Sequence, residues 1–358
     1  MQKAPPQEKM TSKKGVAIEV NRPTISLCMI VKNEECRLGR CLQSAVTKVD
    51  EIIVVDTGSS DETVNIAKAF GAIVIHHEWK HDFADARNRG LQSATKEYIL
   101  WLDADEELKG DEKPFDYILN PAEPGPDILA VQVRNYYGQD EPIDEEKAFL
   151  AYQYRLIKNN GKIRFFQPIH ERLTINETTV IAYSNKESMY IDHFGYLDSI
   201  VKEKAKSERN IQLLVKQLEE NEQNHWALFH LANELSGLNQ FRLAFNFVNK
   251  AIICCLDNLI MPPALFYRLK YGILVETASF EGAFPAIDRA IALYDDYVDL
   301  LYYKGLILFH MKKFAESKQV FERCLHLGDD HPAYLVTKGA GSYLAEQQLE
   351  VLEKMGFC

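Results

Sequence analysis

The sequence predicts an α/β domain followed by an all-helical repeat domain. From Pro23 to about residue 197, short apolar runs alternate with helical stretches, which is typical of a mostly parallel sheet covered by helices. After residue 197 strand signals stop and helical periodicity continues. We therefore expect a flexible leader over 1–22, the α/β domain over 23–197 and a helical domain over 198–358.

Composition excludes several classes of protein. The 358 residues include 41 Lys and Arg against 52 Asp and Glu, a net charge of −11, which disfavours nucleic-acid binding and adhesion to anionic membranes. No apolar run is long enough to span a bilayer, and the first fifteen residues lack the apolar core of a secretory signal. The seven cysteines form no CxxC pair, so we expect a cytoplasmic protein.

The first half of the α/β domain predicts four strands and three helices. Continuous apolar runs predict buried strands over 25–31, 51–56, 72–75 and 98–102, with helices over 34–46, 63–70 and 85–95. Ligands of such sheets bind at the carboxyl ends of the strands. Asp56 and Asp103 stand at two of these ends, so we expect Asp56 and Asp105 to face a common cleft.

The second half of the α/β domain is less regular. Proline and acidic residues interrupt the pattern over 110–127. Further strands are expected over 128–137, 153–166 and 188–195, with a hairpin turn at 159–161, where the sequence reads Asn-Asn-Gly.

The helical region contains a repeated spacing of packing residues. Ala232 is followed by Ala244, Val248 and Ala251 at offsets of 12, 16 and 19, and Gly305 is followed at the same offsets by a similar set, namely Ser317, Phe321 and Cys324. This is typical of stacked helix pairs of about 34 residues. A less regular pair fits over 272–293. We interpret the region as a short tetratricopeptide-like (TPR-like) array; an ordinary helical bundle is the alternative.

Two carboxylates directly after the strand over 98–102 form the strongest chemical signal. Asp103 and Asp105 are separated by one residue, and oxygen ligands of this kind suit Mg²⁺ or Mn²⁺ holding a diphosphate. The alternative is a capped turn leading into an acidic helix.

Other polar residues near strand and helix ends are candidates for the same site. Asp56 has the geometry to accept hydrogen bonds from a planar NH group or a ribose, or else it opens the turn that follows it. The pair Asn33 and Glu34 either contacts the same nucleotide or caps a helix. Arg87 and Asn88 near a helix start either face a phosphate or form a solvated helix end.

Four motifs in this order resemble the inverting nucleotide-sugar glycosyltransferases of family 2. They are PTISLCMIVKNEE over 23–35, VVDTGSSDET over 54–63, FADARN over 83–88 and YILWLDADE over 98–106. The resemblance implies the GT-A fold. It also implies that Asp56 contacts the uracil, that Glu34 and Asp103 contact the ribose, and that Asp105 binds the metal. The full set of implied nucleotide-sugar contacts is Val31, Asn33, Glu34, Asp56, Asp85, Arg87, Asn88, Asp103 and Ala104.

The rest of the chain narrows the resemblance. The segments YRLIKNNGKIRF over 154–165, PIHE over 168–171 and IDHFGY over 191–196 precede a basic helix and the repeats. This arrangement is similar to bacterial glycosyltransferases with carboxy-terminal TPR repeats, among them the sublancin-type enzymes that glycosylate bacteriocin peptides on cysteine or serine. It implies a cytoplasmic bacterial enzyme that uses Mn²⁺ or Mg²⁺ and a UDP-sugar, with UDP-glucose favoured, and a peptide acceptor.

The catalytic base does not follow from the resemblance, because the chain lacks the Glu-Asp pair and the Q-x-x-R-W string of other family 2 branches. Inverting transfer needs a base for the acceptor proton. We favour Glu171, with His170 orienting it or sharing its role; a structural histidine is the alternative. By resemblance, His193 completes the metal shell with Asp105, whereas a surface turn histidine is the alternative.

Two other functions compete with peptide glycosylation. One is extension of a cell-surface polysaccharide or lipid-linked glycan, and the other is a non-enzymatic scaffold with a vestigial nucleotide-sugar site. The helical array is expected to bind the acceptor peptide or to form a homodimer.

Overall fold

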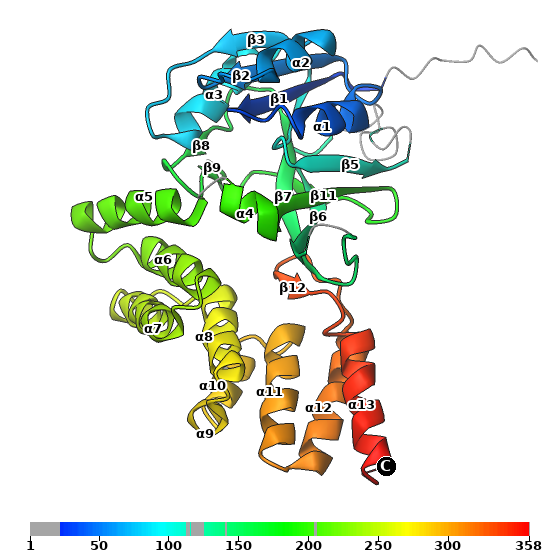
Figure 1. Cartoon of the computed structure of the whole chain (residues 1–358), viewed down its shortest axis with the longest axis vertical. Coiled ribbons are helices and arrows are strands. Elements are labelled where there is room, and N and C mark those ends of the chain that lie inside the picture. The colour runs from blue at the N-terminus through cyan, green and yellow to red at the C-terminus, as the bar shows by residue number, and fades with distance from the viewer. Residues whose placement is uncertain (1–21, 112–114, 116–124, 140–141, 204–205, 358) are drawn as a thin grey trace, which may run out of the picture.

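A computed structural model describes residues 22–111, 115, 125–139, 142–203 and 206–357. The expected leader and most of the interrupted segment over 110–127 lie outside these residues. The chain forms a sheet-based half and a helical half (Figure 1), so the predicted fold class, a GT-A-like α/β domain followed by TPR-like helices, is confirmed. None of the helices in the described ranges has both the length and the hydropathy needed to cross a membrane.

The α/β half contains eleven of the described strands and the first helices. The strands are β1 (Ile25–Val31), β2 (Glu51–Asp56), β3 (Ile73–His76), β4 (Tyr98–Trp101), β5 (Glu106–Gly110), β6 (Ile128–Gly138), β7 (Ala148–Lys158), β8 (Phe165–Phe166), β9 (Arg172–Leu173), β10 (Ile181–Tyr183) and β11 (Met189–Leu197). The helices are α1 (Leu38–Ala45), α2 (Thr63–Ala69), α3 (Phe83–Ser93) and α4 (Asp198–Glu203).

One mixed sheet organises this half. Its order is β3-β2-β1-β4-β7-β6-β11-β5, with β10 also paired to β6. The strands β3, β2, β1 and β4 run parallel, whereas β7 is antiparallel to both β4 and β6. Asp56 ends β2, and Asp103 follows β4. Because β1 lies between β2 and β4, these two acids are not on adjacent strands.

Apolar side chains on both faces explain the strands β1, β2 and β4. Ile25, Leu27 and Met29 of β1 pack with α1 in one buried cluster, and Cys28 packs toward α3 in another. Burial on both faces is typical of a parallel sheet with helices above and below. Polar residues therefore begin only where each strand leaves the core.

The expected hairpin at 159–161 is wrong. β7 already ends at Lys158, between its antiparallel neighbours β4 and β6. The chain after the turn instead forms β8, which pairs with β9 in a small separate sheet. The acidic helix considered after Asp105 is also absent from the described residues, because Glu106–Gly110 forms β5.

The helical half consists of helices packed in pairs. They are α5 (Lys206–Glu220), α6 (His225–Gly237), α7 (Phe241–Asp257), α8 (Ala264–Glu276), α9 (Phe280–Ala283), α10 (Ile287–Leu293), α11 (Val298–His310), α12 (Phe314–Leu327) and α13 (Tyr343–Lys354). Ala232 of α6 and Ala244 of α7 are fully buried, as are Phe321 and Cys324 of α12. The side chain of Ser317 donates a hydrogen bond to the carbonyl of Gly305 across the α11–α12 pair, at 2.8 Å.

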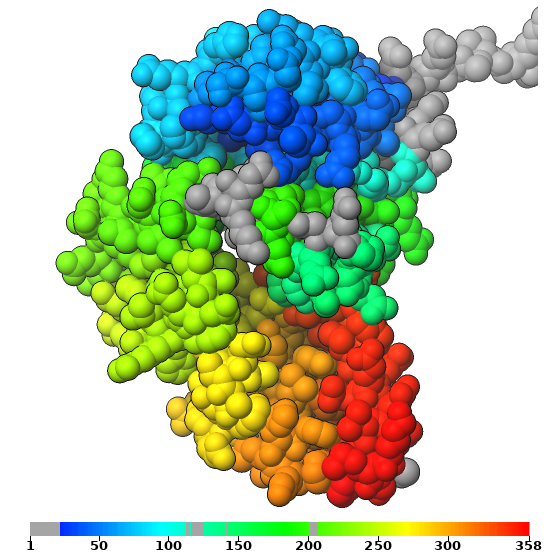
Figure 2. Space-filling view, viewed as in Figure 1, coloured from blue at the N-terminus to red at the C-terminus, as the bar shows by residue number. Residues whose placement is uncertain are grey.

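The helical half also contributes a strand, which the sequence did not predict. β12 (Val336–Thr337) pairs antiparallel with Leu150 and Phe149 of β7. Figures 1 and 2 show this C-terminal segment returning to the α/β half. The two halves are thus joined at α4–α5 and again at β12.

Candidate active site

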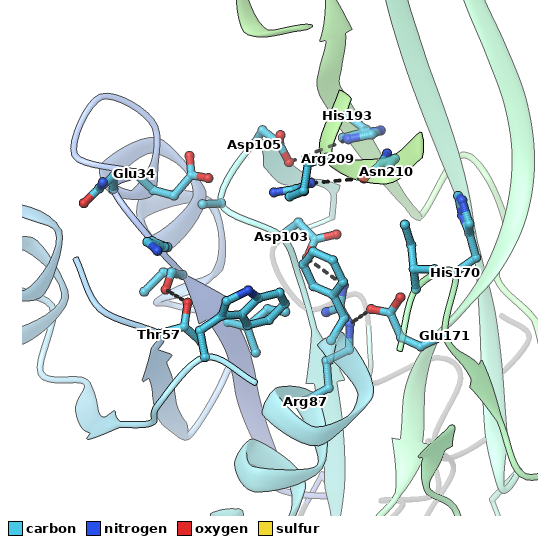
Figure 3. Close-up of a pocket in the computed structure, with 18 of the residues that line it drawn as sticks. Glu34, Thr57, Arg87, Asp103, Asp105, His170, Glu171, His193, Arg209 and Asn210 are labelled. Atoms are coloured by element: carbon cyan, nitrogen blue, oxygen red, sulfur yellow. Dashed lines mark hydrogen bonds and ion pairs between the residues drawn. The ribbon is translucent and has the colours of Figure 1, made fainter. Parts of the chain in front are cut away.

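A cavity of about 650 Å³ lies where β1 and β4 end and α5 and α6 approach the sheet. Figure 3 shows its side chains converging from the α/β half and from α5. Among the predicted site residues, the following line it: Val31, Asn33, Glu34, Arg87, Asp103, Ala104, Asp105, His170, Glu171 and His193.

A buried ion pair between Arg155 and Glu106 stabilises the loop that carries Asp103 and Asp105. Arg155 of β7 donates to Glu106 at 2.9 Å, and the same carboxylate accepts the backbone NH of Asp103 at 2.8 Å. Because this pair lies in the core, it fixes the loop rather than contacting a ligand. The two acids of the loop are therefore presented at the cavity wall.

Asp105 and His193 lie together and fit a divalent cation. Nε2 of His193 is 3.6 Å from Oδ1 of Asp105, and Nδ1 lies 2.8 Å from Oδ1 of Asn135. A hydrogen bond from Nδ1 to an oxygen acceptor orients a histidine so that Nε2 can bind a metal. The described ranges contain no group of three or more His, Cys, Asp or Glu side chains placed to hold a metal ion. However, Mg²⁺-type sites commonly use one or two protein ligands together with water and substrate phosphates, so these two residues fit such a cation.

Arg87 connects two other site residues. Its Nε donates to Glu171 at 2.6 Å, and its second terminal nitrogen donates to Asp103 at 2.9 Å (Figure 3). Burial disfavours the charged guanidinium, but the two carboxylates outweigh this effect and raise the pKa of Arg87. Burial likewise raises the pKa of Asp103, whereas Arg87 and Arg155 lower it, with a net decrease. Both partners are therefore ionised, and Arg87 is already neutralised by protein groups.

His170 stands at the boundary between the two halves of the chain. Its backbone has φ of +52°, an unusual value for a residue other than glycine, and its ring stacks on His230 of α6 at a centroid distance of 3.5 Å. Burial lowers the pKa of His170 to about 4, against an opposing effect of Glu171. Its Nε2 makes no hydrogen bond to any described residue. At neutral pH this ring is therefore uncharged, and its Nε2 is buried.

Three predicted contacts do not line the cavity. The Asp56 carboxylate accepts backbone NH groups of the turn that follows and contacts His76 at 3.2 Å; its contact with the uracil and its shared cleft with Asp105 stay predictions. The Asp85 carboxylate contacts His77 at 3.0 Å. Asn88 exchanges two hydrogen bonds with the backbone of Phe165. In each case the polar group is hydrogen-bonded to neighbouring protein groups.

Sequence reasoning missed the contribution of other segments to the cavity wall. Thr57, Trp79, Phe83, Tyr196, Arg209, Asn210, Asn233 and Glu234 also line it. The last four belong to α5 and α6, and no local motif marks them. The basic character of the segment after residue 197 was the one signal that pointed to α5.

Known proteins resemble this chain in sequence. Residues 26–182 match the family described as Glycosyl transferase family 2. A TPR repeat-containing protein of Synechococcus elongatus is 30% identical over 78% of this chain and 68% of its own length. The glycosyltransferase SunS of Bacillus subtilis is 32% identical over 64% of this chain.

These similarities indicate a glycosyltransferase domain followed by TPR-like helices. The chain belongs to glycosyl transferase family 2. It spans about half, 53%, of the length of SunS. Among solved structures, Staphylococcus aureus TarS (residues 1–349) aligns with 69% of this chain and 86% of its own, at 14% identity and a TM-score of 0.36.

Proposed function

We propose that the protein is a metal-dependent inverting glycosyltransferase that moves a hexose from a UDP-sugar, with UDP-glucose favoured, to a Cys, Ser or Thr side chain of a peptide. One observation carries this proposal. Asp103, Asp105 and His193 lie on the wall of the same cavity as His170 and Glu171. A cation-binding pair and a candidate base therefore share one space large enough for a nucleotide-sugar.

Asp105 and His193 would hold Mn²⁺ or Mg²⁺. When bound, the cation supplies positive charge that stabilises the departing diphosphate. Val31, Asn33 and Glu34, at the end of β1, would contact the nucleoside, and Asp103 its ribose. Asp56, Asp85 and Asn88 do not line this cavity, and their polar groups make hydrogen bonds within the protein; the nucleotide-sugar contacts expected of them stay predictions.

Glu171 is proposed to take the acceptor proton. Its Oε1 is engaged by Arg87, so Oε2 would receive the proton from the attacking thiol or hydroxyl. The lone pair of sulfur or oxygen then forms the new bond to the anomeric carbon. The bond from that carbon to the β-phosphate oxygen breaks, and its electron pair leaves with UDP. Attack from the face opposite UDP inverts the anomeric configuration.

His170 is proposed to assist by orienting Glu171, since its own ring is stacked on His230 and its Nε2 is buried. A thiol needs less help than a hydroxyl, because its ordinary pKa of about 8.5 lies near neutrality. The substitution Glu171→Gln should therefore lower kcat by about 10²–10⁴-fold for a serine acceptor, and by less for a cysteine acceptor. UDP binding should remain within about threefold of the wild type, because Arg87 keeps its ion pair with Asp103.

The peptide acceptor is supported by the resemblance to sublancin-type enzymes and by the helical array beside the cavity. Helix-pair arrays present surfaces suited to extended partners. A cytoplasmic location is supported by the six described cysteines, which are all free thiols. A homodimer is supported by exposed apolar side chains near the end of α7, where Leu259 is 96% and Met261 60% exposed.

The decisive experiment offers the purified chain Mn²⁺, a panel of UDP-sugars and two acceptor sets. One set contains Cys- and Ser-rich peptides, and the other contains lipid-linked and polysaccharide acceptors. A hexose mass increment on a peptide supports the proposal. Transfer only to a lipid-linked glycan or polysaccharide supports the alternative acceptor class. If the chain neither binds nor hydrolyses any UDP-sugar, the proposed enzymatic activity is refuted and the scaffold alternative is favoured.

A further inference from the structure

One positively charged side chain on the cavity wall, that of Arg209, comes from the helical half of the chain. Arg209 lies near the start of α5 and lines the cavity together with Asp103 and Asp105 (Figure 3). Its guanidinium donates one long hydrogen bond, 3.4 Å, to Asn210. No ion pair joins it to a carboxylate among the described residues. We propose that Arg209 binds the diphosphate of the donor, an inference that rests on the function proposed above.

The balance of charge in the cavity supports a phosphate ligand for this residue. The wall carries five carboxylates, on Glu34, Asp103, Asp105, Glu171 and Glu234, against three permanent cations, on Lys32, Arg87 and Arg209. Arg87 is neutralised by Asp103 and Glu171. A diphosphate entering this acidic space needs positive charge beyond a divalent cation. Lys32 and Arg209 are the described side chains that can provide it.

Contacts from two elements hold Arg209 in place. The Asn210 side chain donates to Glu234 of α6 at 2.7 Å, which fixes α5 against α6. The guanidinium carbon lies 5.3 Å from the centre of the Phe83 ring at the start of α3. Burial lowers the pKa of Arg209 against the opposing effects of Glu234 and Glu34, so nearby protein charges do not fully compensate this cation.

The chemistry of arginine favours it over Lys32 for this task. A guanidinium presents paired NH groups that match two phosphate oxygens, whereas an ammonium acts as a point charge. Lys32 directly follows β1, beside Asn33, whose backbone and side chain bond the turn at Ser59 and Ser60. Lys32 is therefore placed toward the expected nucleoside end, and Arg209 approaches from the opposite half of the molecule.

The test compares the affinities of UDP and UMP for the full chain by calorimetry, with Mn²⁺ and again with EDTA. Arg209→Ala should weaken UDP binding by about 10–100-fold, the range of a lost charge-assisted hydrogen-bond pair. UMP binding should change by less than about threefold, since UMP lacks the second phosphate. Arg209→Lys should recover part of the loss. The matched control is Arg242→Ala, an exposed arginine on α7.

The possible outcomes separate this inference from the proposed function. If the wild type binds UDP and Arg209→Ala binds it equally well, the inference is overturned while the proposed function stands. If Lys32→Ala loses the preference for UDP over UMP and Arg209→Ala does not, the role belongs to Lys32 and the inference is likewise overturned. If the wild type binds neither nucleotide, the proposed function fails and this inference fails with it.

Discussion

Asp105 and His193 illustrate how single residues define the candidate metal site. The aspartate follows β4 by four residues, and the histidine lies in β11, paired to β5 opposite Glu106. Strand pairing thus brings together two side chains separated by 88 positions in the sequence. The resemblance suggested both residues, and the register of β11 against β5 explains their proximity.

Asp105→Asn should reduce transfer by at least about 100-fold in the presence of Mn²⁺, because the amide is a much poorer ligand for a hard cation. The measurement is kcat with the best donor, together with circular dichroism to verify folding. Glu107→Gln is the matched control, since Glu107 lies two residues further on, in β5, and pairs with Lys109 outside the cavity. Turnover near the wild-type rate in Asp105→Asn would remove Asp105 as a metal ligand.

The stacked pair of His170 and His230 predicts a specific pH dependence of stability. Burial lowers the pKa of His170 to about 4, and burial together with His170 lowers the pKa of His230 well below 6.5. Between about pH 6.5 and 4 the unfolded chain therefore binds more protons than the folded chain. Stability should fall as the pH falls through this window.

His230→Phe keeps an aromatic ring but removes one titrating group. Its free energy of unfolding should depend less steeply on pH between 6.5 and 4, by up to about 1.4 kcal/mol per pH unit. Urea denaturation at several pH values measures this slope. His326→Gln, at an exposed position of α12, should leave the slope unchanged. An unaltered slope in His230→Phe would contradict the effect of burial on this pair.

At the scale of elements, the helix pairs depend on small residues at their crossings. A Cβ atom added to Gly305 would lie 2.5 Å from the Phe321 ring, which is fully buried in the facing helix. Gly305→Ala should therefore destabilise the protein by about 1–3 kcal/mol through overpacking. Chemical denaturation measures the effect.

Gly237 provides the control for this prediction. It ends α6, and an added Cβ atom would meet no atom within 4 Å. Gly237→Ala should be neutral or stabilising by up to about 1 kcal/mol, because alanine favours helix. Equal stability of the Gly305 and Gly237 variants would show that the α11–α12 crossing tolerates a methyl group.

Local patterns predicted the elements that are buried on both faces, and failed for those that depend on distant partners. The apolar runs of β1, β2 and β4 leave no alternative to a core strand. By contrast, β5 contains Glu106, Glu107 and Lys109, and it is a strand because β11 lies beside it. The Asn-Asn-Gly sequence correctly indicated that the chain turns after β7. It did not indicate that β7 pairs with β4 and β6 rather than with the segment after the turn.

The same distinction holds in the candidate site. Asp103 and Asp105 were identifiable because a strand end fixes where they lie. Asp56 also ends a strand, yet its carboxylate is used by the turn that follows, an outcome that the sequence left open. Arg209 and Glu234 reach the cavity only through docking of the helical half, and no short-range pattern encodes that contact.

At the scale of the whole molecule, a buried network fastens β12 to the helices. Arg268 of α8 donates to Asp299 of α11 at 2.6 Å and to Thr337 of β12 at 3.1 Å. Asp299 also accepts the backbone NH of Thr337 at 2.9 Å. The Arg268 guanidinium lies over the Phe149 ring of β7, 4.8 Å from its centre. One polar cluster thereby links both halves of the chain.

Asp299→Ala should destabilise the protein by about 3–5 kcal/mol, because it leaves Arg268 buried without its carboxylate partner. The free energy of unfolding is measured in urea. Asp295→Ala, at an exposed position just before α11, should change stability by less than about 0.5 kcal/mol. A similar small effect of Asp299→Ala would show that the network is not needed to hold β12.

The pairing of Val336 with Leu150 has a consequence for biosynthesis. During synthesis the α/β half emerges from the ribosomal exit tunnel long before residue 336. At that stage β7 therefore lacks one of its pairing partners. That contact spans 186 positions and is slow to close for a growing polypeptide. The sheet beside the cavity is therefore completed only after the helices from α5 to α12 have been made.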